Sequence, residues 1–151
     1  MSSLLKLDQN ITLVQEVWNP SSDILKILQD KNYFIKRRPD GYGGSAIFIN
    51  DDRLKPLSDP IQINDDSHIV KISIGGDRNM WISSLYINRK SKKSLLDTVS
   101  KIQSIVPPTE WQYLLLGGDW NINIQDKQDK VTQTLNIVCK IWGSQSQAVD
   151  V

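Results

Sequence analysis

Residues 114–122 read LLLGGDWNI, and this stretch contains the pattern that we expect to decide the fold. Three consecutive leucines indicate a strand that is buried on both faces. Gly117 and Gly118 then allow the chain to turn, and Asp119 and Asn121 follow with one residue between them. Because buried strands end at the rim of a core, where α/β proteins place ligand sites, we interpret Asp119 and Asn121 as candidate site residues.

A second carboxylate follows another apolar run. Glu16 ends the segment ITLVQE, whose composition predicts a strand over about residues 11–17. If this strand lies beside the leucine-rich strand and points the same way, Glu16 and Asp119 share one pocket. The spacing alone leaves open the alternative that each carboxylate simply ends a strand at the surface.

Length and composition predict one domain over residues 1–151. Hydrophobic residues make up 39% of the chain and charged residues 23%, which is typical of a folded globular protein. A net charge of +1 argues neither for nor against a polyanionic partner. The sequence has no signal-peptide pattern and no apolar run of membrane length. We therefore expect an intracellular protein, in the nucleus or the cytoplasm, that is not secreted and has no membrane partner.

Cysteine and histidine each occur once. A single cysteine, Cys139, excludes an internal disulfide, and its apolar helical context IVCKIW predicts a small core residue. The only histidine, His68, lies in the polar segment NDDSHIV. We interpret it as an exposed residue at the start of a strand rather than as a displaced catalytic base.

Periodicity predicts helices that alternate with a meander of short strands. Strand-forming residues dominate from about residue 33 to residue 86, with a hairpin turn at Gly75-Gly76-Asp77. Apolar residues recur at helical spacing in four segments, and Gly143 is a suitable end for the last of them. The expected helices cover about residues 2–9, 22–31, 94–106 and 131–142. This order favours an α/β sandwich with a mixed or antiparallel sheet.

Four pieces of the sequence occur in an order that resembles the endonuclease/exonuclease/phosphatase superfamily, the fold of deoxyribonuclease I and apurinic endonucleases. They are a strand ending in Gln15-Glu16, the strand GYGGSAIFI, a strand ending in LYIN, and Gly-Asp-x-Asn at residues 118–121. The wording of GGSAIFIN and LLLGGDWN is most similar to the endonuclease domains of non-LTR retrotransposons. The resemblance runs from about residue 11 to residue 124.

The resemblance implies Mg²⁺-dependent hydrolysis of a phosphodiester, with DNA nicking as the expected reaction and Mn²⁺ as an alternative ion. Glu16 matches the metal-binding glutamate, which suits a hard cation. Asp119 matches the aspartate that orients or deprotonates the attacking water, and Asn121 the amide that binds phosphate and places this aspartate. Tyr86 matches the tyrosine that contacts the scissile phosphate. Gln15 would support these groups by hydrogen bonding around them.

Two elements of the family pattern have no match here. The family begins with a strand that carries a site asparagine and ends with a Ser-Asp-His stretch. We therefore expect a partial deoxyribonuclease I-like domain, truncated at both ends, with weak or no activity, because losing such groups costs about 10²–10⁴ in rate. An uncovered sheet face in a partial domain would favour self-association.

Two other functions remain open. The chain could act on another phosphoester, such as a phosphoinositide, a sphingolipid or RNA, or it could be a non-catalytic remnant that binds nucleic acid or a partner chain. The basic segment at residues 89–93 would suit a nucleic-acid backbone, although a solvated helix start has the same composition. Trp18 and Trp120 could stack on bases, with core packing as the alternative that we favour.

Overall fold

A computed structural model describes residues 10–17, 32–38, 40, 43–87, 91–122 and 125–145 of the chain. The elements, in chain order, are β1 Ile11–Gln15, β2 Asn32–Arg37, β3 Gly44–Ile49, β4 Lys55–Pro56, β5 Ile61–Asn64, β6 Ser67–Gly75, β7 Arg78–Tyr86, α2 Lys92–Ile105, the 3₁₀ helix η2 Pro108–Tyr113, β8 Leu114–Asp119 and α3 Lys130–Gln145. The helices expected at residues 2–9 and 22–31 lie outside the described residues.

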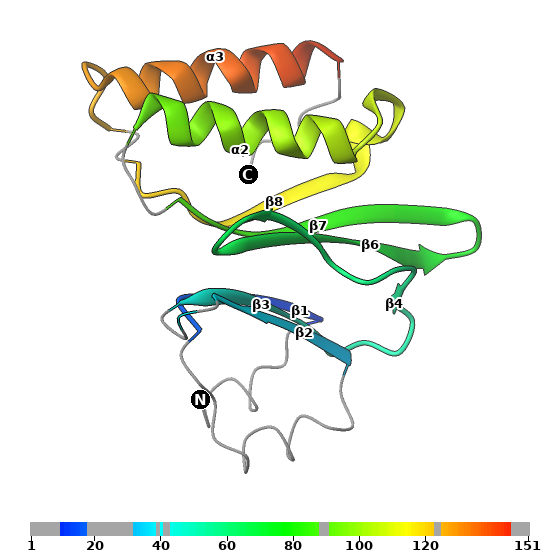
Figure 1. Cartoon of the computed structure of the whole chain (residues 1–151). Coiled ribbons are helices and arrows are strands. Elements are labelled where there is room, and N and C mark those ends of the chain that lie inside the picture. The colour runs from blue at the N-terminus through cyan, green and yellow to red at the C-terminus, as the bar shows by residue number, and fades with distance from the viewer. Residues whose placement is uncertain are drawn as a thin grey trace.

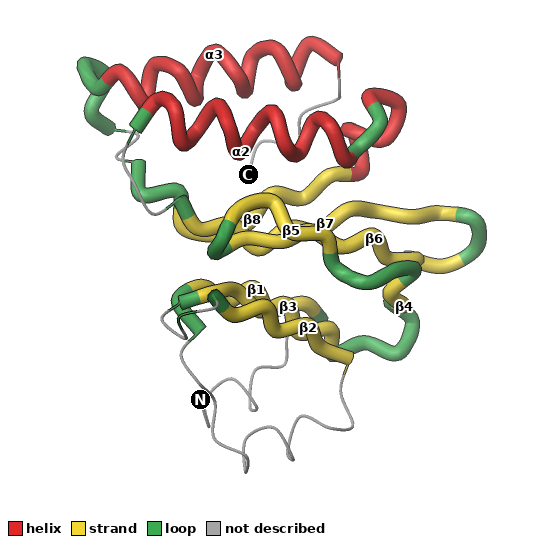
Figure 2. Tube along the Cα trace, viewed as in Figure 1, coloured by secondary structure: helices red, strands yellow, loops and turns green. Residues whose placement is uncertain are grey.

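The described elements form three layers (Figure 1). One sheet has the order β1-β3-β2 and is antiparallel throughout. The second has the order β4-β6-β7-β8, with β5 also paired to β6, and β8 runs parallel to β7. Helices α2 and α3 cover one face of the second sheet, and the first sheet packs on its other face (Figure 2). This arrangement confirms the predicted α/β sandwich with a mixed sheet.

The core between the sheets consists of branched aliphatic side chains. Ile47 and Ile49 of β3 pack against Val70, Ile72 and Ile82 of β6 and β7, and all of these side chains are buried. They alternate with residues on the opposite face of each strand, so each sheet presents one apolar face to the other. Burial of this kind supplies most of the favourable free energy of folding.

The structure of α2 explains why the sequence pattern predicted this helix. Ser91 caps its N-terminus, because its hydroxyl accepts a hydrogen bond from the Ser94 N–H at 3.0 Å. Leu95, Val99 and Ile102 form the predicted buried stripe. Among the residues that the structure describes, no helix combines the length and apolar character needed to cross a membrane.

Several sequence expectations were wrong in detail. Gly143 does not end the last helix, since α3 continues to Gln145. Cys139 is exposed on α3 rather than part of the core. The short strands β4 and β5 and the 3₁₀ helix η2 were not predicted, because each is too short to give a clear period.

Candidate functional site

The site begins where the parallel strands β7 and β8 end. Tyr86 and Asp119 are the last residues of these strands and are opposite each other in the register. The main chain stays paired just beyond, because the Ile87 N–H donates to the Asp119 carbonyl at 3.0 Å. Parallel pairing therefore aligns the ends of the two strands at one edge of the sheet. The expectation that the three leucines lie in a strand buried on both faces was wrong, because β8 is only partly buried and lies at the end of the strand order described for its sheet.

Glu16 reaches this edge from the other sheet. The Tyr86 hydroxyl donates a hydrogen bond of 2.7 Å to Glu16 Oε1. The strands before Glu16 and Asp119 are thus not neighbours in one sheet, since β1 and β8 belong to different sheets. Face-to-face packing of the sheets, rather than pairing of the strands, brings the two carboxylates to the same edge.

The two glycines of LLLGGDWNI lie inside β8, which runs through them to Asp119 instead of turning at them. A Cβ on Gly117 would lie 2.3 Å from Leu13 Cδ1, so this glycine makes room for a side chain of the opposite sheet. Gly118 has φ +139°, and a Cβ there would lie 2.0 Å from the Leu85 carbonyl oxygen. Both glycines therefore serve close packing, which the sequence interpretation as a turn had missed.

Asp119 and Asn121 are locked together by local hydrogen bonds. The Asn121 N–H donates to Asp119 Oδ1 at 2.9 Å, as in an Asx turn. The Asn121 side-chain Nδ2 donates to the Ile87 carbonyl at 2.7 Å. One carboxylate oxygen of Asp119 is thereby fixed, and the short spacing of the acid and the amide has a structural cause.

Two residues of the site have an unusual backbone. Glu16 has φ 54° and Asn121 has φ 51°, and they are the only non-glycine residues with positive φ in the described parts of the chain. The left-handed region costs a residue with a Cβ about 1–2 kcal/mol, although asparagine tolerates it better. Such conformations cluster at functional sites, where they aim side chains that regular strands would point elsewhere.

The Tyr86 hydroxyl lies among the polar groups of the site. The hydrogen bond to Glu16 is the main cause that raises the pKa of this phenol, and the negative charge of Asp119 acts in the same direction. The side-chain amide of Asn121 lowers the pKa by favouring the ionised oxygen. The phenolic oxygen of Tyr86 therefore lies within interaction range of the other three residues expected at the site, Glu16, Asp119 and Asn121.

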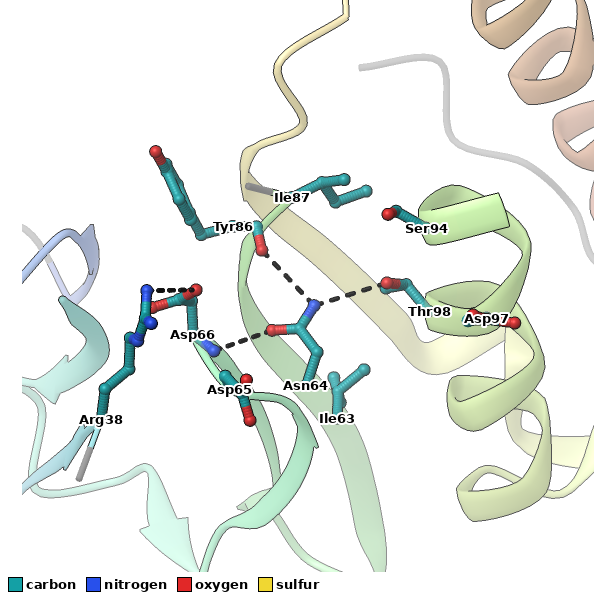
Figure 3. A pocket seen from close by; sticks show the side chains of 10 residues that line it. All are labelled: Arg38, Ile63, Asn64, Asp65, Asp66, Tyr86, Ile87, Ser94, Asp97 and Thr98. Atoms are coloured by element: carbon teal, nitrogen blue, oxygen red, sulfur yellow. Dashed lines mark hydrogen bonds and ion pairs between the residues drawn. The ribbon is translucent and has the colours of Figure 1, made fainter. Parts of the chain in front are cut away.

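A cavity of about 360 Å³ adjoins Tyr86 (Figure 3). Asn64 organises its wall, because its Nδ2 donates to the Tyr86 carbonyl and to Thr98 Oγ1, both at 3.4 Å. Its lining residues are Arg38, Ile63, Asn64, Asp65, Asp66, Tyr86, Ile87, Ser94, Asp97 and Thr98. The sequence reasoning missed this cavity, although the polar run Asn64-Asp65-Asp66 between two strands was a usable signal.

The charged side chains that line this cavity are mostly acidic or held in ion pairs. Arg38 lies 2.9 Å from Asp40 and 3.9 Å from Asp66. Burial raises the pKa of Asp66, and the positive charge of Arg38 opposes this effect. With Asp65 and Asp97 also in the wall, the cavity does not favour a phosphate group.

His68 was expected at the surface, and this expectation is wrong. Its side chain has no exposed area, and its Nδ1 is hydrogen-bonded to the buried hydroxyl of Ser45. Burial lowers the pKa of the imidazole to about 4, and the charge of Lys36 adds to the effect. The polar segment around His68 concealed its burial, because the first sheet covers this end of β6.

The donor set suits a weakly held hard cation. No group of three or more His, Cys, Asp or Glu side chains within the described ranges could hold a metal ion by itself. Glu16 nevertheless presents an exposed carboxylate at the site, with Oε1 facing Tyr86. Mg²⁺ commonly binds through one or two carboxylates, with water and substrate phosphate as its other ligands, so the residues present fit this ion.

The two tryptophans and the basic segment give less information about the site. Trp120 packs against the cores on both sides of α2, which supports core packing rather than base stacking. Trp18 and residues 88–90 lie outside the described parts of the chain. Lys92 and Lys93 form the exposed start of α2, and Lys93 is paired with Asp97 at 2.6 Å.

No family model matches the sequence, and no curated protein sequence matches it. Solved structures do match the fold. The endonuclease domain of TRAS1, a telomere-specific non-LTR retrotransposon, is 20% identical, with a TM-score of 0.68 over 89% of this chain and 60% of that one. A functionally unknown conserved protein from Enterococcus faecalis V583 is 16% identical, with a TM-score of 0.65 over 90% of this chain and 61% of its own.

A third match is a truncated TDP2 from Caenorhabditis elegans, 18% identical, with a TM-score of 0.54 over 82% of this chain and 55% of that one. The chain thus spans about three fifths of the length of the first two solved structures. At these identities the likeness establishes the fold. It confirms the predicted deoxyribonuclease I-like architecture, with only part of that fold present in this chain.

Proposed function

We propose that this chain carries part of the active site of a metal-dependent phosphodiesterase, and that its reaction is the nicking of DNA. The observation that carries the proposal is the meeting of Glu16, Tyr86, Asp119 and Asn121 at one edge of the sandwich. They come from three distant parts of the sequence, and two of them have the strained backbone typical of functional sites.

In the proposed reaction Glu16 holds a Mg²⁺ or Mn²⁺ ion through its carboxylate. When bound, the ion neutralises charge that develops on the phosphate oxygens. Asp119 accepts the proton of the attacking water or orients that water, and Asn121 fixes the carboxylate through its own N–H. Tyr86 points its hydroxyl at the same edge and can donate to a phosphate oxygen once the phosphate competes with Glu16 for it.

DNA is the proposed substrate class because the first of the matching structures is a retrotransposon endonuclease domain. The chain itself offers Lys92 and Lys93 just beyond the end of β7. Binding that depends on these lysines should weaken as salt increases. RNA and lipid phosphoesters share the same chemistry at phosphorus, so the assay includes them as competing substrates.

The test is nicking of supercoiled plasmid by the purified chain in Mg²⁺ and in EDTA, at high protein concentration. We expect slow, metal-dependent nicking that Asp119→Ala lowers by at least about 10²-fold. Asp77→Ala is the matched control, because Asp77 is an exposed carboxylate in the turn at the other end of β7. Nicking that survives in Asp119→Ala would come from a contaminant and would refute the proposal.

A different result would favour the non-catalytic alternative. If the chain binds DNA in a salt-dependent manner but shows no metal-dependent turnover of plasmid, RNA or phosphoinositide, it acts as a binding remnant. Analytical ultracentrifugation of the same samples measures self-association, because a dimer would contain two copies of the candidate site.

A further inference from the structure

The apolar core between the two sheets gives way to polar residues in the row next to the site. In the first sheet this row is the cross-strand pair Gln15–Ser45, and in the second it is the pair His68–Ser84. Ser45, His68 and Ser84 have no exposed area. We call these four residues the polar row.

Hydrogen bonds connect the polar row across the two sheets. Gln15 Nε2 donates to Ser84 Oγ at 3.1 Å, and Ser84 Oγ donates to the Val14 carbonyl at 3.1 Å. The Ser45 hydroxyl is hydrogen-bonded to His68 Nδ1. Further along the strands the two sheets meet through aliphatic side chains such as Ile47, Val70 and Ile82, which pack together but cannot form hydrogen bonds.

Burial of these polar groups is a poor way to gain stability. His68 Nε2 is buried and has no hydrogen-bond partner in the described structure. A buried polar atom without a partner costs about 1–3 kcal/mol, and an aliphatic pair would fill the same space without that penalty. A directional contact, in contrast, fixes how two sheets lie relative to each other in a way that packing does not.

The polar row is joined to both sides of the contact between Glu16 and Tyr86. On the Glu16 side of the contact, Gln15 directly precedes Glu16. Val17 directly follows Glu16, and its N–H donates to the Gly44 carbonyl at 3.3 Å. Ser84 lies two residues before Tyr86. The Tyr86 N–H donates at 2.7 Å to the hydroxyl of Ser67, the residue next to His68.

We propose that the polar row positions the site, and that His68 and Gln15 are positioning residues that set the two sheets so that Glu16 meets Tyr86. The inference rests on the proposed function for its meaning, since the positioned group is the proposed metal ligand. It assigns the only histidine of the chain a role away from the reacting atoms. Its contact to Ser45 holds the sheets together at the end that carries the site.

The test removes both members of one contact, which leaves no partner unsatisfied. Ser45→Ala combined with His68→Leu replaces the hydrogen-bonded pair by apolar side chains, and His68→Asn retains a hydrogen-bonding atom near the position of Nδ1. Urea unfolding reports whether each variant is folded. A purely structural role predicts that stability changes while the site is unaltered in the folded protein.

Two measurements report on the site itself. The first is the ¹³Cζ NMR signal of Tyr86, assigned with Tyr86→Phe. In the wild type Glu16→Gln should move this signal, and in the Ser45→Ala/His68→Leu background it should no longer do so. The second is the affinity for Mn²⁺ alone, measured by calorimetry. It should fall about 10- to 100-fold in the double variant and recover in His68→Asn.

The outcomes separate this inference from the proposed function. If the folded double variant keeps the response of the Tyr86 signal to Glu16→Gln, the positioning role is refuted. If that response is lost but the wild type binds Mn²⁺ no better than Glu16→Gln does, the positioning role stands and the proposed metal site fails.

Discussion

The hydroxyl of Tyr86 donates a 2.7 Å hydrogen bond to Glu16, and this contact joins the ends of two strands that belong to opposite sheets. The candidate site is therefore assembled across the sandwich rather than within one loop. Its geometry depends on how closely the sheets approach each other, and the small residue Gly117 under Leu13 is part of that approach. Substitutions at the sheet interface should consequently affect the site without touching it.

Glu16→Gln and Tyr86→Phe should have different kinetic effects. Glu16→Gln removes the charge that holds the cation, so the Mg²⁺ concentration needed for half-maximal nicking should rise at least about 10-fold. Tyr86→Phe removes a donor to the phosphate, so the maximal rate should fall about 10²-fold at a nearly unchanged metal requirement. Plasmid nicking over a Mg²⁺ titration measures both. An unchanged Mg²⁺ requirement in Glu16→Gln would contradict the role of this residue as a metal ligand.

Asn121→Gly and Asn121→Ala should separate the backbone role of Asn121 from that of its amide. Both variants lose the 2.7 Å bond to the Ile87 carbonyl, but only alanine must hold a Cβ at φ 51°. We expect Asn121→Ala to be less stable than Asn121→Gly by about 1 kcal/mol in urea unfolding. Nicking should be impaired in both. Equal stability of the two variants would show that the left-handed backbone at this position carries no strain.

The strands before Glu16 and Asp119 could be predicted from the sequence because each signal is local, whereas the roles expected of Tyr86 and Asn121 came from the family resemblance. Glu16 and Asp119 each follow an apolar run, and both runs form strands, although β1 and β8 are only partly buried and lie at the ends of the strand orders described for their sheets. The parallel pairing of β7 with β8, which places Tyr86 opposite Asp119, was not predicted. The expectation that Glu16 and Asp119 share one pocket assumed that their strands are neighbours, and this assumption was wrong, because β1 and β8 belong to different sheets.

Long-range packing was not readable in the same way. The burial of His68 depends on Ser45, and the need for Gly117 depends on Leu13, and both partners are distant in sequence. A polar segment around a histidine has the composition of an exposed segment, whether or not another sheet covers it. The wall of the cavity beside Tyr86 was missed for the same reason, because Asn64 and Thr98 meet only in the folded chain.

Gly118→Ala should destabilise the protein far more than Gly117→Ala. At Gly118 a Cβ would lie 2.0 Å from the Leu85 carbonyl oxygen and 2.6 Å from its nitrogen, and the main chain of β7 cannot move aside. We expect a loss of roughly 3 kcal/mol or more in the free energy of unfolding. At Gly117 the close atom is the end of the Leu13 side chain, so a loss of about 1 kcal/mol should follow. Urea unfolding of both variants gives the comparison, and similar losses would contradict it.

His68 should make the stability of the protein depend on pH on the acid side. Its folded-state pKa is lowered from 6.5 to about 4, mainly by burial, so between these values the unfolded chain binds a proton that the folded chain does not. The buried neutral imidazole of His68 makes its full contribution to the free energy of unfolding above pH 6.5. This contribution is lost as the pH falls toward 4, and the loss amounts to up to about 3 kcal/mol. The measurement is urea unfolding of the wild type and His68→Asn from pH 7.5 to 4, because the difference between the two curves removes the titration of the carboxylates. Parallel curves over this range would mean that the folded imidazole titrates as it does in the unfolded chain.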